Sequence, residues 1–248
     1  MTILCYHSVQ PDWVSPLSIT PEAFRGQAEW LAQQRRVLPL SEAVARLDRS
    51  GRIRAGATAM TFDDGFAALH EYALPVLTRH RLAATVFLVA ETLTPQGRTV
   101  DWVDTPPPYP LRTLTVDHVR EMQDAGVEFA SHSYSHLDLT TLAYADCVAD
   151  LRRSRELLED LLHQRVPFLA YPRGRHDAHV RLAAERAGYS HAFTLPQTRE
   201  CPGPFAVPRV GIFPGNDVWG MRLKLRRSYL PMRTSPVFPL LRRTLRRG

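Results

Sequence analysis

Two adjacent carboxylates, Asp63 and Asp64, stand at the end of an apolar run and are followed by Gly65. The run Ala57–Phe62 has the composition of a buried strand, so the pair lies where a strand breaks into a turn. Neighbouring buried anions repel each other unless a cation lies beside them. The conflict is resolved if one carboxylate binds a metal while the other accepts a proton. Alternatively, an aspartate caps the following helix and the glycine makes the turn.

A pair of histidines, His132 and His136, follows a second predicted strand, Val127–Ser131. Imidazoles at this spacing converge on one ion, on a helical turn or in a tight loop. Two histidines and one carboxylate form a common metal-binding face that leaves positions open for water. Because the aspartates also follow a strand, the pattern predicts a divalent metal site. The alternative is a pair of surface or capping histidines.

A third strand runs into a turn at Leu169–Gly174. Gly174 allows the backbone to approach a ligand closely, and an amide nitrogen here is placed to donate to an oxyanion. Taken alone, such a turn is usually structural. Three strand ends with polar groups together indicate one reactive site, because the carboxyl ends of parallel strands meet at one edge.

Seven predicted strands alternate with helical segments and position these turns. The strands are Ile3–Tyr6, Ala57–Phe62, Ala84–Val89, Val127–Ser131, Phe168–Tyr171, His191–Thr194 and Ala206–Ile212. The alternation predicts parallel β–α units, and seven strands are enough to close a barrel, with an open doubly wound sheet as the alternative. No internal repeat or Gly/Ser linker interrupts the chain, which favours a single domain.

The segments between the strands carry helix signals. Thr20 and Ser41 are expected to cap two early helices, the second ending at Gly51. The proline-rich stretch 91–113 is too long for an ordinary connection, so we expect it to form a wall over one side of the site.

The composition excludes several classes of protein. The 248 residues are 44% hydrophobic and 23% charged, which excludes a disordered chain, and no apolar run approaches a membrane span of about 20 residues. The amino terminus lacks the regions of a signal peptide, which predicts a cytoplasmic protein. Cys5, Cys147 and Cys201 have no paired spacing, so we expect no disulfide framework, no cysteine zinc site and no part in the chemistry.

The net charge of +6 is concentrated at the carboxyl end. Nine of the 31 basic residues lie at positions 222–247 and no acidic residue follows Asp217, so the end carries +9 and residues 1–217 carry −3. Mixed leucines and arginines there favour peripheral contact with an anionic membrane at its inner face, with a solvated end as the alternative. Nucleic acid is not an expected partner, because the segment has no recognised binding motif.

Thr61–Gly65, His132–His136 and Tyr171–Gly174, in this order, resemble the motifs of the polysaccharide deacetylases, the NodB-homology group of carbohydrate esterase family four. The resemblance covers most of residues 1–215, which are expected to form the deacetylase domain. The basic tail, 216–248, lies outside it. It implies a distorted (β/α)7 barrel and a divalent metal, usually Zn²⁺, with Co²⁺ or Ni²⁺ as alternatives. It also implies hydrolysis of N-acetyl groups from amino sugars.

The resemblance further implies roles for individual residues. By position, Asp63 is the general base, and the metal ligands are Asp64, His132 and His136. The backbone amide of Arg173 is the implied donor to the oxyanion.

Two positions depart from the family pattern. Ala170 stands where many members have an arginine that orients the base, and Arg209 is the candidate replacement, with a surface arginine as the alternative. No Leu-x-His pattern supplies the usual acid histidine on a late strand. His7 ends the first strand, as in the circularly permuted poly-N-acetylglucosamine deacetylases, and is the candidate general acid. Closure of the barrel would bring this strand next to the last one.

Three aromatic residues are candidates for contact with sugar rings, with a place in the core as the alternative; they are Trp102, Tyr134 and Tyr171. The expected partner is an N-acetylated glycan in a polysaccharide, an oligosaccharide or a lipid-linked form; the sequence does not fix the oligomeric state. The two departures leave a second function open. This is a glycan-binding barrel of the same fold with weak or absent catalysis.

Overall fold

A computed structural model describes residues 2–50, 56–236 and 238. Its main sheet is parallel, in the order β10-β9-β8-β7-β6-β5-β1-β11, with β4 beside β5. The strands are β1 (Thr2–Tyr6), β4 (Arg36–Val37), β5 (Ala57–Phe62), β6 (Thr85–Leu88), β7 (Glu128–Ser131), β8 (Phe168–Ala170), β9 (His191–Thr194), β10 (Val207–Pro208) and β11 (Val210–Gly211). A separate pair, β2 (Ser8–Val9) and β3 (Ser18–Ile19), follows β1.

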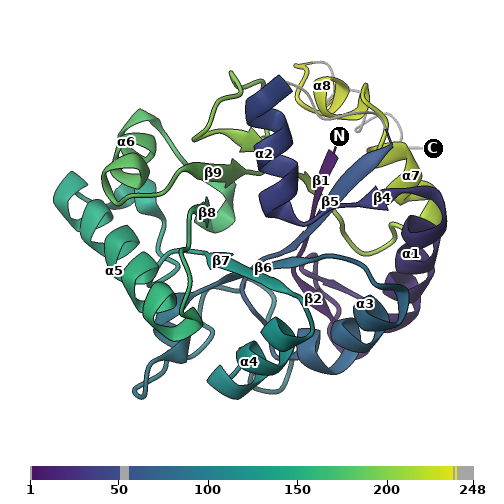
Figure 1. The fold of residues 1–248 in the computed structure, drawn as a ribbon, viewed down its shortest axis with the longest axis horizontal. Helices are drawn as coiled ribbons and strands as arrows, with labels where there is room; N and C mark the ends of the chain where they lie inside the picture. Colours follow the sequence, from purple (N-terminus) through teal and green to yellow (C-terminus); the bar gives the residue numbers. More distant parts are fainter. Residues whose placement is uncertain (1, 51–55, 237, 239–248) are drawn as a thin grey trace.

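The sheet curls into a nearly closed barrel (Figure 1). Strands β10 and β11 are separated only by Arg209, yet β10 pairs with β9 and β11 pairs with β1. The last segment of the barrel therefore lies between its two edges. If β10 and β11 are taken as one strand, the ring has the seven strands that the sequence predicted, and the alternative of an open sheet is excluded.

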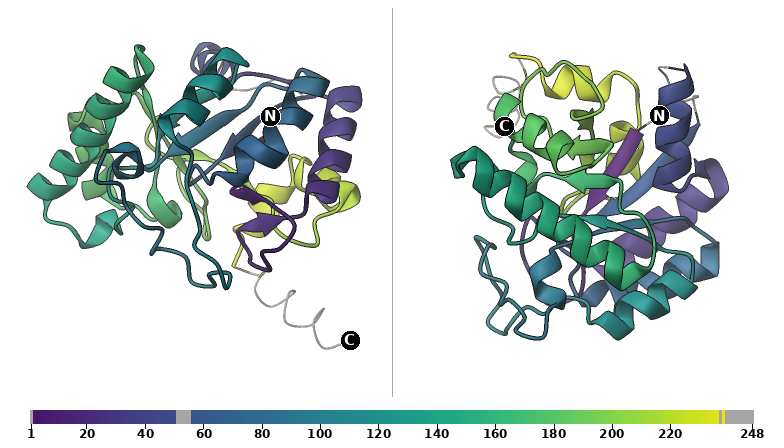
Figure 2. Two further views of the ribbon diagram at one scale, coloured as in Figure 1. Left: turned by 90° about the horizontal axis from the view of Figure 1, so that it is seen from below. Right: turned by 60° about the vertical axis from the view of Figure 1, so that its left-hand side comes forward.

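Helices surround the barrel (Figure 2). They are α1 (Pro21–Gln34), α2 (Leu40–Ser50), α3 (Leu74–His80), α4 (Val116–Asp124), α5 (Tyr144–Leu162), α6 (Ala178–Arg186), α7 (Val218–Lys224) and α8 (Tyr229–Arg233). The hydroxyl of Thr20 caps α1 as predicted, accepting from the amide of Ala23 at 3.2 Å.

The predicted cap of the second helix was wrong. Helix α2 begins at Leu40, so Ser41 lies inside it. The carboxylate of Glu128 in β7 accepts hydrogen bonds from the amides of Leu40 at 2.9 Å and Ser41 at 3.3 Å. Glu128 therefore caps the helix in place of the serine. The predicted end of this helix, Gly51, lies outside the described residues.

Side-chain alternation along the strands creates the barrel interior. Ile3, Ala59, Phe87 and Phe193 belong to one buried cluster inside the ring, together with side chains of α2. Their strand neighbours, such as Leu4, pack outward against the surrounding helices. The same alternation continues along the strands past this cluster. Toward the carboxyl-terminal end of a strand, every second side chain therefore also faces the inside of the barrel.

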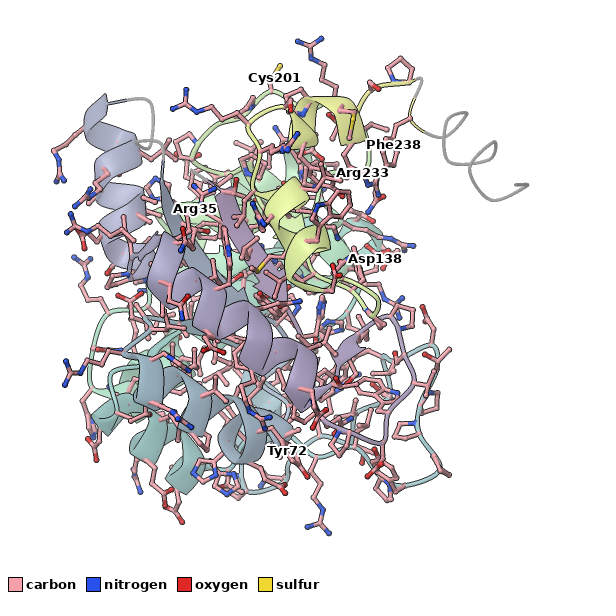
Figure 3. The ribbon with its side chains drawn as sticks, turned by 90° about the vertical axis from the view of Figure 1, so that its right-hand side faces the viewer. Arg35, Tyr72, Asp138, Cys201, Arg233 and Phe238 are labelled. Carbon is pink, nitrogen blue, oxygen red and sulfur yellow. The ribbon has the colours of Figure 1, made fainter. Side chains whose placement is uncertain are left out.

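Helices α7 and α8 follow residue 215 in the described part of the chain. Helix α7 lies beside α1 (Figure 3). Its Met221 is fully buried and accepts a hydrogen bond at sulfur from Tyr6 Oη at 3.6 Å. The boundary between a domain at 1–215 and a tail at 216–248 stays a prediction. Within the described part of the chain, no helix combines the length and hydropathy needed to cross a membrane.

Candidate active site

The polar motifs meet in one cavity of about 260 Å³ at the carboxyl ends of the strands. Its lining includes His7, Asp63, Asp64, Trp102, His132, His136, Arg173 and Gly174. Trp102, Asp104 and Thr105 come from the stretch 91–113. The structure therefore brings the three motifs together and places the expected wall beside them.

Asp64, His132 and His136 form a buried cluster. Each offers one ligand atom, and these three atoms lie within 4.8 Å of one another. Nε2 of His136 is 3.2 Å from Oδ1 of Asp64, and Nε2 of His132 is 3.6 Å from the same oxygen. The three groups thus face a common point.

The backbone at this cluster is held in conformations that side chains disfavour. Asp64 has φ 70°, Ser133 has φ 67° and His136 has φ 55°. Such residues persist where the surroundings over-determine them, and they gather at functional sites. Gly65 follows at φ 62°, and a Cβ there would lie 2.8 Å from Cδ2 of Leu88. The turn after Asp64 therefore favours glycine.

Neighbouring groups orient the cluster. Nδ1 of His132 is hydrogen-bonded to the carbonyl of Ala170 at 2.8 Å, which leaves Nε2 for the common point. The indole of Trp102 donates to Oδ1 of Asp64 at 3.1 Å, and its ring stacks on His136 at 4.7 Å between centroids. Partners of this kind fix the rotamer and tautomer of metal ligands.

Asp150 supports the histidine loop from α5. Its carboxylate accepts from the amides of Tyr134 at 3.0 Å and Ser135 at 3.2 Å, and from the Ser135 hydroxyl. Asp150 does not stand out in the sequence, because it lies beyond the motif on a helix with many charged side chains. The only sequence signal is its place on the buried side of that helix.

The cluster suits a divalent metal ion. Burial lowers the pKa of His132 to about 4, so the ring is neutral at pH 7, as a metal ligand must be. Two imidazoles and one carboxylate match the donor sets that bind Zn²⁺, Co²⁺ or Ni²⁺.

Asp63 is paired with Arg209. Nη1 of the arginine is 2.6 Å from Oδ1 of Asp63, and Nη2 is 2.8 Å from Oδ2. Both side chains are buried, and the guanidinium lies 5.1 Å from the Phe87 ring centroid. Burial alone would raise the pKa of Asp63, but Arg209 reverses this and holds it well below its ordinary value. Asp63 is therefore ionised at neutral pH.

His7 and Arg173 both line this cavity. A ring nitrogen of half-buried His7 lies within 4.8 Å of a carboxylate oxygen of Asp63, and Nδ1 has no hydrogen-bond partner among the described residues. Arg173 has φ 56°, and its guanidinium donates to the carbonyl of Trp102 at 2.8 Å. Arg173 thereby ties the third motif to the wall.

Two of the three predicted sugar contacts lie in the core instead. Tyr171 is fully buried and its hydroxyl donates to the carbonyl of Phe205 at 3.1 Å. Tyr134 is 6% exposed and packs in the core, with the guanidinium of Arg153 3.9 Å from its ring centroid. Trp102 alone of the three lines the cavity.

A family model described as polysaccharide deacetylase matches residues 51–192, more than half of the chain. The chain belongs to the polysaccharide deacetylase family. This confirms the predicted resemblance and the assignment of the chain to the deacetylase hydrolases.

Named relatives agree with the assignment of this deacetylase. The putative polysaccharide deacetylase YxkH of Bacillus subtilis is 26% identical over 87% of this chain and 72% of its own length. The poly-beta-1,6-N-acetyl-D-glucosamine N-deacetylase of Staphylococcus epidermidis is 25% identical over 84% of this chain and 71% of its own length.

Solved structures share the fold of the deacetylase. The Streptococcus pyogenes deacetylase PplD superposes with a TM-score of 0.77 and 22% identity, covering 91% of this chain and 98% of its own. IcaB from Ammonifex degensii superposes with a TM-score of 0.74 and 24% identity, covering 90% of this chain and 96% of its own. These likenesses confirm the NodB-type barrel.

Proposed function

We propose that this polysaccharide deacetylase hydrolyses N-acetyl groups of amino sugars in a polysaccharide, an oligosaccharide or a lipid-linked glycan, with a divalent metal as cofactor. One observation carries the proposal. A buried Asp-His-His cluster and an arginine-held carboxylate share a single cavity. The cluster is suited to bind a metal ion, and the carboxylate is suited to accept a proton. Metal-assisted amide hydrolysis requires both a bound metal and a general base.

Asp64, His132 and His136 would hold the metal, with Zn²⁺ the best match and Co²⁺ or Ni²⁺ as alternatives. When bound, such an ion polarises the acetyl carbonyl and acidifies a water molecule. Trp102 fixes Asp64 in place and forms the wall against which the sugar ring would lie.

Asp63 takes the proton of the attacking water as general base. Arg209 keeps the carboxylate of Asp63 ionised and holds both of its oxygens. It thereby takes the role of the family arginine, whose position is occupied here by Ala170. The backbone amide of Arg173 donates to the oxyanion that develops on the acetyl oxygen. His7 protonates the departing sugar amine, so that water and amide give acetate and a free amine.

The test is acetate release from a panel of monomeric, oligomeric and lipid-linked N-acetylated sugars. Protein stripped with a chelator is compared with protein reloaded with Zn²⁺ or Co²⁺. The proposal predicts release by the reloaded protein only. A chain that binds these glycans with no bound metal and no acetate release would instead be the glycan-binding barrel.

Arginines and tryptophans of α1, α7 and the residues just after each helix support the predicted contact with an anionic membrane. One shallow surface is lined by Arg35 (Figure 3), Arg222 and Arg226, together with Trp30 and with Trp219, which is 68% exposed. We propose that this arginine–tryptophan face binds lipid phosphates at the inner face of the membrane. The free cysteines fit a reducing compartment such as the cytoplasm.

Flotation with vesicles of anionic or neutral phospholipid tests this contact. Binding is expected with the anionic vesicles and should fall in the variant Arg222→Gln/Arg226→Gln. Arg120→Gln, an exposed arginine of α4, is the matched control. Equal binding by the double variant and the control would contradict the proposed face.

A further inference from the structure

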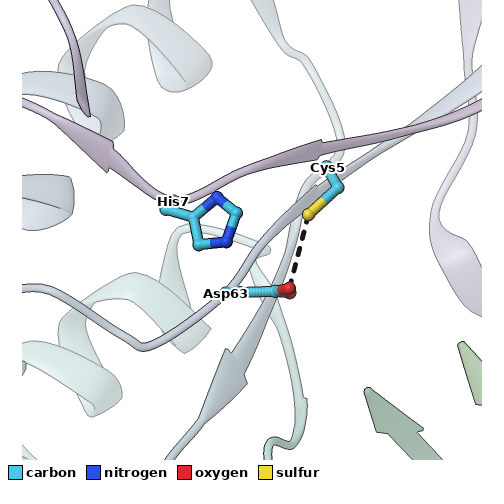
Figure 4. A group of neighbouring side chains, drawn as sticks. All are labelled: Cys5, His7 and Asp63. Carbon is cyan, nitrogen blue, oxygen red and sulfur yellow. Dashed lines mark hydrogen bonds between the residues drawn. The ribbon is translucent and has the colours of Figure 1, made fainter. Parts of the chain in front are cut away.

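A cysteine lies against the proposed base, contrary to the expectation that the three cysteines take no part. Cys5, His7 and Asp63 each offer an atom within 4.8 Å of the others (Figure 4). This composition resembles a second set of metal ligands. However, Arg209 already contacts both oxygens of Asp63, so a metal ion on this carboxylate would face a buried guanidinium. Like-charge repulsion therefore disfavours a metal here, and a hydrogen bond is the interaction that remains.

The strand register sets this contact. Cys5 of β1 pairs with Thr61 of β5, two residues before Asp63, and it shares the inward face of β1 with Ile3. The thiol is completely enclosed, and Sγ lies 3.3 Å from Oδ2 of Asp63. The other acceptor in reach, the carbonyl of Tyr6, is farther away at 3.6 Å.

The thiol is held in its donating form. Burial raises the pKa of Cys5 well above its ordinary value, and the negative charge of Asp63 adds to this while Arg209 opposes it. The S–H therefore stays protonated and points its hydrogen at an anion. A thiol is a weak donor, but an ionised acceptor strengthens the bond.

The hydrogen bond from Cys5 limits the acceptor positions that remain on the Asp63 carboxylate. A carboxylate offers about four lone-pair positions, two on each oxygen. Nη2 of Arg209 and Sγ of Cys5 occupy both positions of Oδ2, whereas Nη1 of Arg209 occupies one position of Oδ1. Among the residues that the structure describes, no other side chain donates to Oδ1. One position, on Oδ1, is thus left for the proton of the water.

We propose that Cys5 is a positioning residue for the base, whose thiol occupies Oδ2 of Asp63 so that proton transfer takes place at Oδ1. This inference rests on the proposed function, in which Asp63 is the base. The thiol itself does not react. It acts by restricting the carboxylate to one orientation and one free acceptor position.

The kinetic test compares Cys5→Ala, Cys5→Ser and Cys147→Ala in the zinc-loaded full chain. Cys147 is a second buried free cysteine, in α5, and controls for the loss of a buried thiol. Cys5→Ala should lower kcat for acetate release about tenfold with KM and bound zinc unchanged, as expected for one hydrogen bond to a charged group. Cys5→Ser, which keeps a donor, should remain within about threefold of the wild type. Cys147→Ala should leave kcat unchanged.

The S–H stretching band in the infrared tests the hydrogen bond without any turnover. The band that Cys5→Ala removes should lie at lower frequency than the band that Cys147→Ala removes. It should move up in Asp63→Ala, whereas the Cys147 band stays in place. A Cys5 band that does not respond to Asp63→Ala overturns the proposed contact.

The outcomes separate the two claims. A wild type that releases acetate, together with an unchanged kcat in Cys5→Ala, overturns the positioning role alone. An equal loss in Cys5→Ala and Cys5→Ser also overturns it, because the donor would then be irrelevant. A zinc-loaded wild type that releases no acetate from any substrate refutes the proposed function, and the positioning role with it, even if the infrared shift is present.

Discussion

Replacement of Arg209 by methionine tests the buried ion pair that is proposed to hold the base. The side chain is fully enclosed and contacts both oxygens of Asp63 at 2.6 and 2.8 Å. Methionine fills most of the volume but leaves Asp63 as a buried charge without its partner. Breaking such a pair on one side costs about 3–5 kcal/mol. In a domain of this size, that lowers the melting temperature by roughly 6–20 °C.

The assay is urea denaturation at pH 7 in the presence of a chelator, so that metal binding adds no stability. Arg120→Met is the matched control, because Arg120 makes a 3.5 Å exposed pair with Asp117 and should change stability by about 0–1 kcal/mol. The double variant Asp63→Asn/Arg209→Met removes both charges and should recover at least about 1 kcal/mol of the loss. A loss below about 1 kcal/mol in Arg209→Met, with no recovery in the double variant, would show that Arg209 does not stabilise the buried charge of Asp63.

The same pair predicts a pH dependence. Because the folded state lowers the pKa of Asp63, the stability that this contributes is fully present above the unfolded pKa of about 3.9. It declines as the pH falls below that value. The difference in stability between the wild type and Arg209→Met should therefore shrink in acid, as repeated urea titrations would show.

Three further outcomes follow from the contacts of the metal cluster. Trp102→Phe keeps the ring on His136 but removes the donor to Asp64, so zinc affinity measured by chelator competition should fall about tenfold. Asp150→Ala leaves two backbone amides of the histidine loop without their acceptor and should cost about 1–3 kcal/mol in urea denaturation. Removal of the metal by dialysis against a chelator should abolish acetate release, and added Zn²⁺ should restore it; release that survives dialysis would count against the cluster.

The meeting of the motifs could be predicted from the sequence, because parallel strands deliver their carboxyl ends to one edge of a sheet. Asp64 and His132 each follow a strand, so their convergence follows from the alternation of strands and helices alone. The pairing of Arg209 with Asp63 was predicted less directly, from an arginine missing at Ala170. It depends on closure of the barrel, which brings the last strand beside the first.

Contacts between distant segments could not be predicted in the same way. Glu128 caps α2 in place of Ser41, across 87 residues of sequence. Tyr171 lies within a motif, but its side chain is buried in the core. The sequence did not predict this, because it does not show which face the side chain at the end of a strand takes. Cys5 was dismissed for lack of a paired cysteine, whereas its partner is a carboxylate on the neighbouring strand.

Bound zinc and acetate release, measured on the same preparations of wild type and Asp63→Asn, test whether Asp63 is the base and not a metal ligand. About one zinc ion per chain is expected in both proteins, since Asp63 is not among the proposed metal ligands. Asp63→Asn should lose acetate release by about 10²–10⁴-fold, the usual contribution of a general base. Turnover of Asp63→Asn within tenfold of the wild type, at equal zinc content, would contradict the assignment of the base.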